Sequence, residues 1–314
     1  MANRFFFGDG IDGAIVESGA NTLTRDMFAT TYETSYAVDM VGYKIFANTS
    51  ITVKTSGILR SNGESGASGS GQTGGAAGGA AAIGSTMGGY PGAAGGSVTS
   101  TSGQNGTGGG SVLCDVESSQ GGSGGNGGQG KDVLCLTNVG VPGTGGASNT
   151  ELKFKHRQFN LFHPWFGSVT VYPGISGASG AGGSGRLVAG RPTGGAGGGS
   201  GGSGGCTWLA APLIDLQSGG LIQSKGGSGG SGANGNAGSN AGGGGAATGG
   251  NGGLVILVYE TLLYNGSIHV TPGSNGTAGN GDNCGANGGG ATLPFDQSGR
   301  VLRLNLSQMV LTAA

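Results

Sequence analysis

Glycine recurs at every third residue in several stretches of this chain, and this spacing restricts the fold more than any other feature. In the ten residues "GISGASGAGG", glycine occupies positions 174, 177, 180 and 183. A chain in the polyproline II conformation has three residues per turn, so every third residue lies on the same face. If that face is always glycine, neighbouring chains can approach closely enough for their backbone N–H and C=O groups to pair. The spacing therefore predicts packed, extended legs that together form a polyglycine II bundle.

Composition bears on the alternatives to such a bundle. Glycine accounts for 80 of the 314 residues, charged residues make up 9%, and the formal net charge is -1. A disordered chain normally has a high net charge, and glycine-rich sequence indicates disorder mainly where no period is present. Collagen needs glycine at every third position over a long run with abundant proline, whereas this chain has 8 prolines. Flexible loops between strands are the simpler alternative to the bundle.

The glycine-rich stretches belong to an internal repeat. Five of them begin alike, 47 to 58 residues apart, and an apolar residue lies five positions before each start. Glycine-rich runs at 194–205 and 249–253 lead directly into apolar segments, so each unit is predicted as a strand, an outgoing glycine leg, a tip and a returning glycine leg. The five units start at Gly63, Gly121, Gly174, Gly226 and Gly273, and the apolar residues before them are Ile58, Val116, Val169, Leu221 and Ile268.

The apolar segments have the composition and the turn residues of short strands. Asn265-Gly266 separates the runs "TLLY" and "SIHV", and Ser56-Gly57 has the same place in another unit; both dipeptides suit tight turns. No segment keeps a helical period. We therefore expect a mainly β fold with almost no α-helix, in which short strands stack like a solenoid and each unit packs on its neighbours. The expected division is residues 1–62 as an N-terminal β-rich attachment or solenoid region, residues 63–290 as a glycine-rich repeat region, and residues 291–314 as a C-terminal strand.

Repeated GxxGxxG legs, polar or aromatic tips and intervening strands together resemble the glycine-rich adhesins at the tips of bacteriophage long tail fibres. The opening "FFFGDGIDGAIV", followed by "NTLTRDMF" and "VGYKIFANTSITVKTSGILRSNG", is also similar to the start of many glycine-rich phage virion proteins. The resemblance implies that the glycine-rich part is a polyglycine II sandwich. Those adhesins carry a dedicated fibre-attachment domain before the sandwich, whereas residues 1–62 here have the pattern of short strands.

The tips between outgoing and returning legs carry the side chains that could recognise a partner, because strands and legs have little side-chain diversity. Residues 131–166 depart furthest from the repeat, and we expect no glycine return leg after Gly130. Within this segment "LKFKHRQFNLF" alternates like an extra strand, so its residues serve either as structural cover or as a contact surface. The candidate receptor-contact residues are Met87, Tyr90, Lys153, Lys155, His156, Arg157, Phe162, Trp165, Arg186 and Arg191.

Few residues in the sequence suggest catalysis. The three histidines lack the spacing of metal ligands, and the GxGxxG strings are not followed by helix signals, so they are by-products of the glycine content. Asp9 and Asp12, in "GDGIDG", could ligate calcium, but the segment matches no complete calcium-binding motif, and a turn is the favoured interpretation. We expect no enzymatic activity, no metal and no cofactor.

The four cysteines are too far apart in sequence for a zinc ribbon or a CxxC redox pair. Cys114 and Cys206 lie in strand-like runs, where we expect buried thiols, and the sequence leaves open whether any of the four, including Cys135 and Cys284, are paired. The N-terminus lacks the apolar run of a signal peptide. The longest apolar run, "LVILVY", is far too short to span a membrane.

These features predict a non-enzymatic bacteriophage virion protein that is made in the host cytoplasm. The leading hypothesis is a receptor-binding adhesin at the tail-fibre or tail tip, with other virion proteins and a host cell-surface receptor as partners. The alternative is a structural virion component, such as a capsid decoration or cement protein or a fibre subunit. An ice-binding protein would need flat polar faces and regular short loops, and the Trp, Phe and Arg residues of the tips count against it. The near-neutral charge disfavours nucleic acid as a partner, and we expect no membrane insertion.

Overall fold

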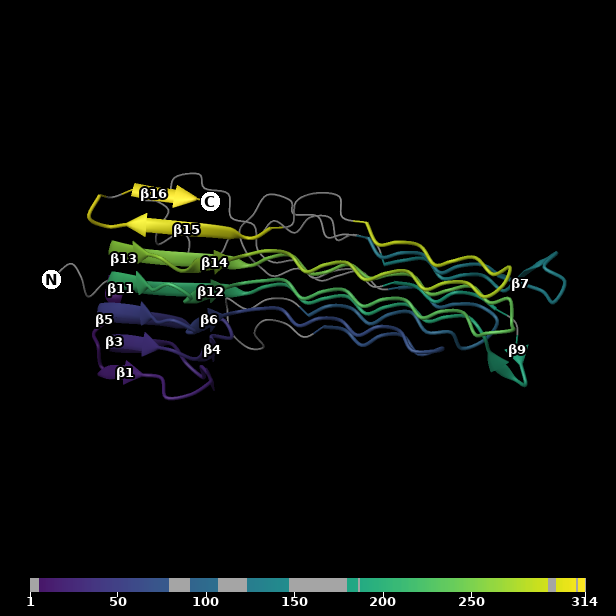
Figure 1. Ribbon diagram of the computed structural model, residues 1–314, viewed down its shortest axis with the longest axis horizontal. Coiled ribbons are helices and arrows are strands. Elements are labelled where there is room, and N and C mark those ends of the chain that lie inside the picture. Colours follow the sequence, from purple (N-terminus) through teal and green to yellow (C-terminus); the bar gives the residue numbers. More distant parts are fainter. Residues whose placement is uncertain are drawn as a thin grey trace.

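The computed structural model describes residues 6–78, 91–106, 123–146, 180–185, 187–292, 298–308 and 310–313. These residues form an elongated molecule with two sheets at one end, and glycine-rich segments run side by side from the sheets to the other end (Figure 1). The described residues are mainly β and contain almost no helix, as the sequence predicts.

The larger sheet has seven strands in the order β1-β3-β5-β11-β13-β15-β16. All neighbours in it are parallel except the last pair, β15 and β16. Its central strands pair over their whole length, from Cys206 opposite Leu254 to Leu216 opposite Tyr264. The strands are β1 (Ala14–Val16), β3 (Met27–Thr34), β5 (Lys44–Val53), β11 (Cys206–Leu216), β13 (Leu254–Tyr264), β15 (Arg300–Asn305) and β16 (Val310–Ala313).

The smaller sheet has five short parallel strands in the order β14-β12-β6-β4-β2. Each of these strands directly follows a strand of the larger sheet, so five consecutive strand pairs run through both sheets in the same order. Three of the five predicted repeat units, those preceded by Ile58, Leu221 and Ile268, supply strand pairs to the two sheets, whereas Val116 and Val169 lie outside the described residues. The strands are β2 (Asn21–Thr22), β4 (Ala37–Asp39), β6 (Ile58–Arg60), β12 (Leu221–Gln223) and β14 (Ser267–His269).

Tight turns join the long and short strands where the sequence predicts them. Ser56-Gly57 lies between β5 and β6, and Ser56 has a positive φ of 69°. Asn265-Gly266 lies between β13 and β14, and both of its N–H groups donate to the carbonyl of Leu216. Neither residue of that dipeptide has a positive φ. β13 and β14 belong to different sheets, so this turn is a corner and not a two-residue hairpin.

The main apolar core lies between the two sheets. Alternate residues of β5, such as Ile45 and Ile51, pack with residues of the smaller sheet, such as Leu59 and Ile222. A second cluster covers the opposite face of the larger sheet around Trp208 and contains Phe7, Leu254, Ile256, Leu302 and Leu304. The first six residues of β11 and of β13 are therefore buried on both faces, which accounts for their unbroken apolar runs.

Backbone hydrogen bonds join the glycine-rich segments to one another in rotation. Along residues 242–247, successive N–H groups donate to three different neighbouring segments, and the cycle repeats after three residues, with N···O distances of 2.8–3.1 Å. Buried amides are satisfied in this way without a β ladder. The donor and acceptor pairs are Gly242 to Ser184, Gly243 to Ala286, Gly244 to Ala233, Gly245 to Ala181, Ala246 to Gly289 and Ala247 to Gly230.

The glycines occupy the positions at which a neighbouring backbone comes close. In residues 226–232, one set of glycines lies against residues 244–250 and a second set lies against residues 64–67. A Cβ on Gly229 would overlap the carbonyl oxygen of Ala247, and a Cβ on Gly230 would overlap that of Ala67. No side chain fits at such a position without moving the backbone, because interiors are close-packed.

The third position of this segment faces outward and carries small polar side chains. The Ser228 N–H donates to Ser65 Oγ at 3.1 Å, and the Ser274 hydroxyl donates to Ser228 Oγ at 3.0 Å. The same arrangement recurs three residues later along each segment, at Ser68, Ser231 and Thr277. Outward-facing amides, which have no backbone partner, are thus satisfied by the hydroxyl of the adjacent segment.

One expectation about the repeat is wrong: a glycine-rich return follows Gly130. Residues 140–146 run back along the bundle, where Gly143 accepts a hydrogen bond from Gly127 N and Gly146 accepts one from Gly124 N, both at 3.0 Å. The return is short and contains Val141 and Pro142, so its glycine period is weak in the sequence.

The fifth repeat unit also lies one residue away from the predicted alignment. Ile58 pairs with Leu221, as the alignment requires, but Ile268 pairs with Ile222 and not with Leu221. Gly273 therefore lies beside Gly227 instead of Gly226. Because residues 226 and 227 are both glycine, the sequence alone does not distinguish the two alignments.

The larger sheet contains strands from all three of the predicted regions. The larger sheet takes β1, β3 and β5 from residues 1–62, β11 and β13 from residues 63–290, and β15 and β16 from residues 291–314. The strands of the repeat region thus complete the sheet that the N-terminal segment begins.

Candidate functional site

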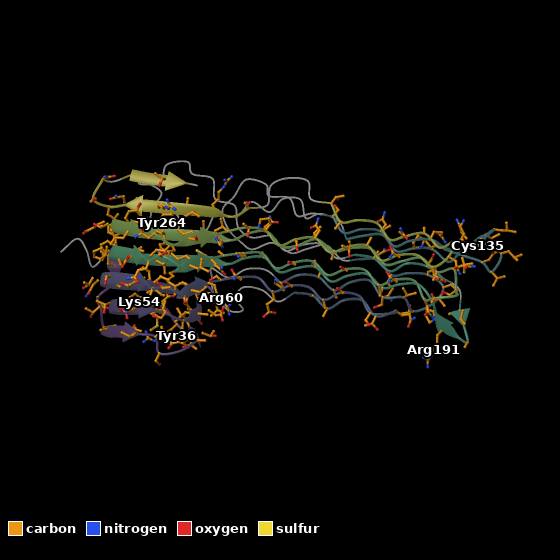
Figure 2. The ribbon with its side chains drawn as sticks, viewed as in Figure 1. Tyr36, Lys54, Arg60, Cys135, Arg191 and Tyr264 are labelled. Atoms are coloured by element: carbon orange, nitrogen blue, oxygen red, sulfur yellow. A yellow bond between two sulfur atoms is a disulfide. The ribbon has the colours of Figure 1, made fainter. Side chains whose placement is uncertain are left out.

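Two hairpins and two turns occupy the end of the molecule that is farthest from the sheets. Figure 2 shows Cys135 and Arg191, one from each hairpin, at this end, whereas Tyr36 and Tyr264 lie among the strands. We call this end the distal tip and define it by residues 130–141, 187–192, 236–240 and 281–285. The hairpin strands are β7 (Gly130–Lys131) with β8 (Asn138–Val139), and β9 (Leu187–Val188) with β10 (Arg191–Pro192).

The distal tip exposes most of the large apolar side chains that face solvent in the described residues. Leu134 and Leu136 are 70% and 76% exposed. Such clustered apolar groups on a surface usually mark an interaction site. The exposed apolar residues of the tip are Val133, Leu134, Leu136, Val141, Leu187 and Val188.

The β9–β10 hairpin has a two-residue loop, Ala189-Gly190. Both residues have positive φ, 50° and 77°, as in the type I′ turn that matches the twist of the flanking strands. The register places Arg191 opposite Val188. The tight loop therefore presents one cationic and two apolar side chains at the end of a short, defined ribbon.

The β7–β8 hairpin is organised around the carboxylate of Asp132. Its Oδ1 accepts the N–H groups of Leu134 and Leu136, at 3.2 and 2.8 Å, and its Oδ2 accepts the Thr137 hydroxyl at 2.7 Å. The Asp132 N–H donates to the Thr137 carbonyl at 2.9 Å. These bonds curl residues 132–137 into a closed turn, and its apolar side chains point away from the turn into solvent.

Hydrogen bonding holds the pKa of the Asp132 carboxyl below its ordinary value. The largest cause is the Thr137 hydroxyl, followed by the Leu136 N–H. All of these groups donate to the ionised carboxylate, which favours that form. The hydrogen bonds of this turn therefore favour the ionised form of the Asp132 carboxyl.

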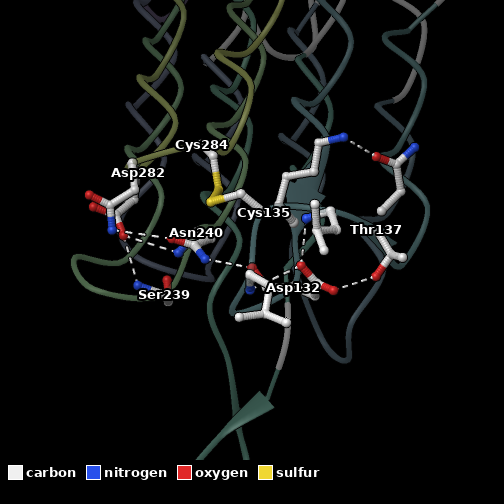
Figure 3. Close-up of a disulfide and its surroundings, with 12 residues drawn as sticks. Asp132, Cys135, Thr137, Ser239, Asn240, Asp282 and Cys284 are labelled. Carbon is white, nitrogen blue, oxygen red and sulfur yellow. Dashed lines mark hydrogen bonds between the residues drawn. A yellow bond between two sulfur atoms is a disulfide. The ribbon is translucent and has the colours of Figure 1, made fainter.

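A second aspartate, Asp282, connects the other two turns of the tip (Figure 3). Its Oδ2 accepts the N–H groups of Ser239 and Asn240, at 2.7 and 3.1 Å. The Asn240 amide then donates to the Asp132 carbonyl at 2.6 Å, and the Asn240 carbonyl accepts the Lys131 N–H at 2.8 Å. Asn240 thus links three of the four segments of the tip, residues 130–141, 236–240 and 281–285.

A disulfide between Cys135 and Cys284 also crosses the tip (Figure 3). The two Cα atoms are 5.9 Å apart and the two residues are 149 positions apart in sequence. The sequence gives no indication of which cysteines pair. Cys206, by contrast, is a buried thiol in β11, as predicted, and Cys114 lies outside the described residues.

Arg191 is the one predicted contact residue whose position the described residues include, and it is exposed on the distal tip. The other nine lie outside the described residues: Met87, Tyr90, Lys153, Lys155, His156, Arg157, Phe162, Trp165 and Arg186.

Sequence reasoning missed the apolar residues of the β7–β8 hairpin. A signal was present in "KDVLCLTN", where an aspartate precedes three exposed apolar residues and Thr137 follows them. Aspartate commonly accepts N–H groups two residues ahead and so favours turns. The composition of this segment is that of a strand. In the structure the segment lies at the end of the bundle, where its apolar side chains are exposed.

The segment "GDGIDG" forms a turn at the sheet end. Arg25 donates to both carboxylate oxygens of Asp12, at 2.9 and 2.7 Å, and the Phe28 N–H donates to Oδ2 at 2.7 Å. The Asp9 carboxylate accepts the Ile11 N–H at 3.2 Å. In the described part of the chain, no three His, Cys, Asp or Glu residues gather as metal ligands would.

Comparisons with protein families, with curated proteins and with solved structures found no match to this chain. The described residues include no helix with the length and apolar character needed to cross a bilayer.

Proposed function

We propose that this protein is a non-enzymatic bacteriophage virion protein that acts as a receptor-binding adhesin through its distal tip. The observation that carries the proposal is the set of exposed apolar side chains that two hairpins present at one end of an elongated molecule. In this arrangement the sheet end faces other virion proteins of the tail or tail fibre. The distal tip then contacts a receptor on the host surface.

The shaft between the two ends is, in this proposal, a polyglycine II bundle that continues a solenoid-like stack of strand pairs. The three-residue rotation of hydrogen bonds along residues 242–247 supports this, because an extended chain with three residues per turn directs successive amides to three sides. Glycine loses much entropy on ordering, and the many lateral hydrogen bonds offset that loss.

A rigid shaft favours binding at the tip, because a surface that is already ordered loses little conformational entropy when a partner docks. Leu134, Leu136 and Leu187 supply apolar contact area and Arg191 supplies a planar cation. Full burial of a leucine side chain contributes about 1.5–3 kcal/mol, and an arginine that a partner buries at an interface can contribute about 2 kcal/mol. No cofactor or metal is needed for such contacts.

The test compares two exposed apolar sites at opposite ends of the molecule. Leu134→Ser combined with Leu136→Ser changes the tip, whereas Ile11→Ser makes the same kind of change at the sheet end, where Ile11 is 78% exposed. Purified protein of each kind is added to host cells, and its ability to block adsorption of the phage is measured. We expect the tip variant to block at least tenfold less well than the wild type and Ile11→Ser to block equally well, with the thermal stability of both unchanged.

Equal blocking by the wild type and the tip variant would contradict the adhesin proposal. If phage carrying the tip variant also adsorb normally but lose integrity in heat or low salt, the protein is instead a decoration or cement component.

A further inference from the structure

The β7–β8 hairpin has no apolar core of its own. Val133, Leu134 and Leu136 all face solvent, so burial does not hold this hairpin against the bundle. Its two strands contain two residues each, and an isolated two-stranded hairpin is at best marginally stable in water. Another restraint must give the hairpin its position.

The hydrogen bonds of residues 133–138 stay within the hairpin. Asp132 accepts the amides of the turn, and Asn138 accepts the Lys131 ammonium at 2.7 Å. Among the described residues, the bond from Cys135 to Cys284 is what joins this outer part to another segment. The base of the hairpin is attached separately, through the contacts of Lys131 and Asp132 with Asn240.

Cys284 belongs to a turn that several hydrogen bonds attach to the end of the bundle. The Asp282 N–H donates to the Ala241 carbonyl at 2.8 Å, and the Gly285 N–H donates to the Asp282 carbonyl at 2.7 Å. The Asn283 amide donates to Asn240 Oδ1 at 3.2 Å. The disulfide therefore connects a weakly held hairpin to the end of the bundle.

The backbone of Cys135 has an unfavourable conformation. Its φ is 60°, in the left-handed region that is unfavourable for a residue with a side chain. Within the hairpin, the Cys135 N–H donates to the Asp132 carbonyl at 3.1 Å, and the disulfide holds the side chain of the same residue from outside the hairpin.

From these contacts we propose that oxidation of Cys135 and Cys284 completes the contact surface of the distal tip, so that the protein binds fully only in its disulfide form. This inference rests on the proposed function. Disulfides persist outside the cell and are rare in the reducing cytoplasm. A particle assembled inside the host would carry the dithiol form and acquire the ordered tip after release.

The oxidant is a low-molecular-weight disulfide, RSSR. The thiolate of Cys135, the more exposed of the two cysteines, attacks one sulfur of RSSR and releases one RS⁻. The Cys284 thiolate then attacks the Cys135 sulfur of the mixed disulfide, and the second RS⁻ leaves. The two protons from the protein thiols pass to the released thiolates, so two RSH form for each protein disulfide.

The experiment uses the full-length protein in three forms: oxidised with glutathione disulfide, reduced with a phosphine, and the double variant Cys135→Ser with Cys284→Ser. Amide hydrogen exchange is followed in residues 131–139 and, as an internal control, in residues 241–253. Blocking of phage adsorption is measured on the same samples. The reductant is also applied to the double variant, which separates this cysteine pair from the other two cysteines.

We expect reduction to speed exchange of the hairpin at least tenfold while residues 241–253 stay protected. Blocking should weaken at least tenfold, and the reductant should have no effect on the double variant, which should behave like the reduced protein. Equal hairpin exchange and equal blocking in the oxidised and reduced forms would overturn the inference and leave the adhesin standing. A hairpin ordered by the disulfide in a protein that blocks adsorption in neither form would overturn the adhesin, and with it the link from oxidation to binding.

Discussion

At the scale of single residues, glycine occupies the positions at which a Cβ would meet the backbone of a neighbouring segment. Residues 63–69 have one such position per triplet, and its glycines lie against residues 196–203. Residues 226–232 have two such positions per triplet, and their glycines lie against residues 244–250 and 64–67. The third position, which faces solvent, takes serine or another small polar residue. The positions of the glycines thus indicate where segments of the bundle pack closely against each other.

This relation predicts that the same substitution has different effects on the free energy of unfolding at two glycines. Gly229→Val places a branched side chain against the Ala247 carbonyl, whereas nothing lies within 4 Å of the Cβ position of Gly290. We expect Gly229→Val to lower the free energy of unfolding by about 1–3 kcal/mol or more, as overpacking does. Gly290→Val should change it by less than about 0.5 kcal/mol. Denaturant unfolding of both variants measures the difference, and equal stabilities would contradict close packing at Gly229.

The three-residue period could be predicted from sequence at this scale, but the neighbours of each glycine could not. Gly226 and Gly227 are identical in sequence, yet one lies against Gly250 and the other against Glu64. That choice depends on the lateral order of the segments, which no local pattern encodes. Because of the same ambiguity, the predicted alignment of the fifth unit is wrong by one residue.

At the scale of elements, the turn around Asp132 depends on a charged carboxylate. Its pKa is lowered in the folded protein by the Thr137 hydroxyl and the Leu136 N–H. A lowered pKa stabilises the turn at pH values above the ordinary range of the carboxyl, and the stabilisation is lost as the pH falls through the lowered pKa. Protonation also replaces one acceptor oxygen of Asp132 by a hydroxyl group.

We therefore expect the turn to be unchanged between pH 8 and pH 5 and to loosen below about pH 4, where aspartate protonates. The amide chemical shifts of Leu134 and Leu136 report this transition by NMR. Asp132→Asn is the control, because it cannot titrate at this position. The same acid transition in Asp132→Asn would show that another group causes it.

Elements differ in how far their sequences predict them. The pairs β5–β6 and β13–β14 follow from apolar runs and their turn dipeptides, since burial and turn chemistry are local signals. The hairpins of the distal tip do not, because their residues Val133 and Leu134 look like core residues and are exposed. The pairing of Cys135 with Cys284 depends on two turns meeting at the end of the bundle, across 149 residues.

At the scale of the whole molecule, the two sheets and the glycine-rich segments share one chain path. Residues 194–205 lead directly into β11, and residues 241–253 lead directly into β13. Bonds within the bundle connect segments that are far apart in sequence, such as Gly199 with Ala67 and Gly125 with Ala246. Separating any central segment from the bundle would therefore expose amides on several others at once.

This connectivity predicts that the centre of the bundle and the sheets unfold together. Amides of residues 241–253 lie among three neighbouring segments, and we expect their exchange to require the same opening as that of β13. Residues 140–146 have fewer partners in the described part of the chain and should exchange faster. Native-state hydrogen exchange in increasing denaturant measures each opening free energy. If residues 241–253 opened with a free energy well below that of β13, the bundle would be a set of separate loops on a stable β core, which is the flexible-loop alternative that the sequence leaves open.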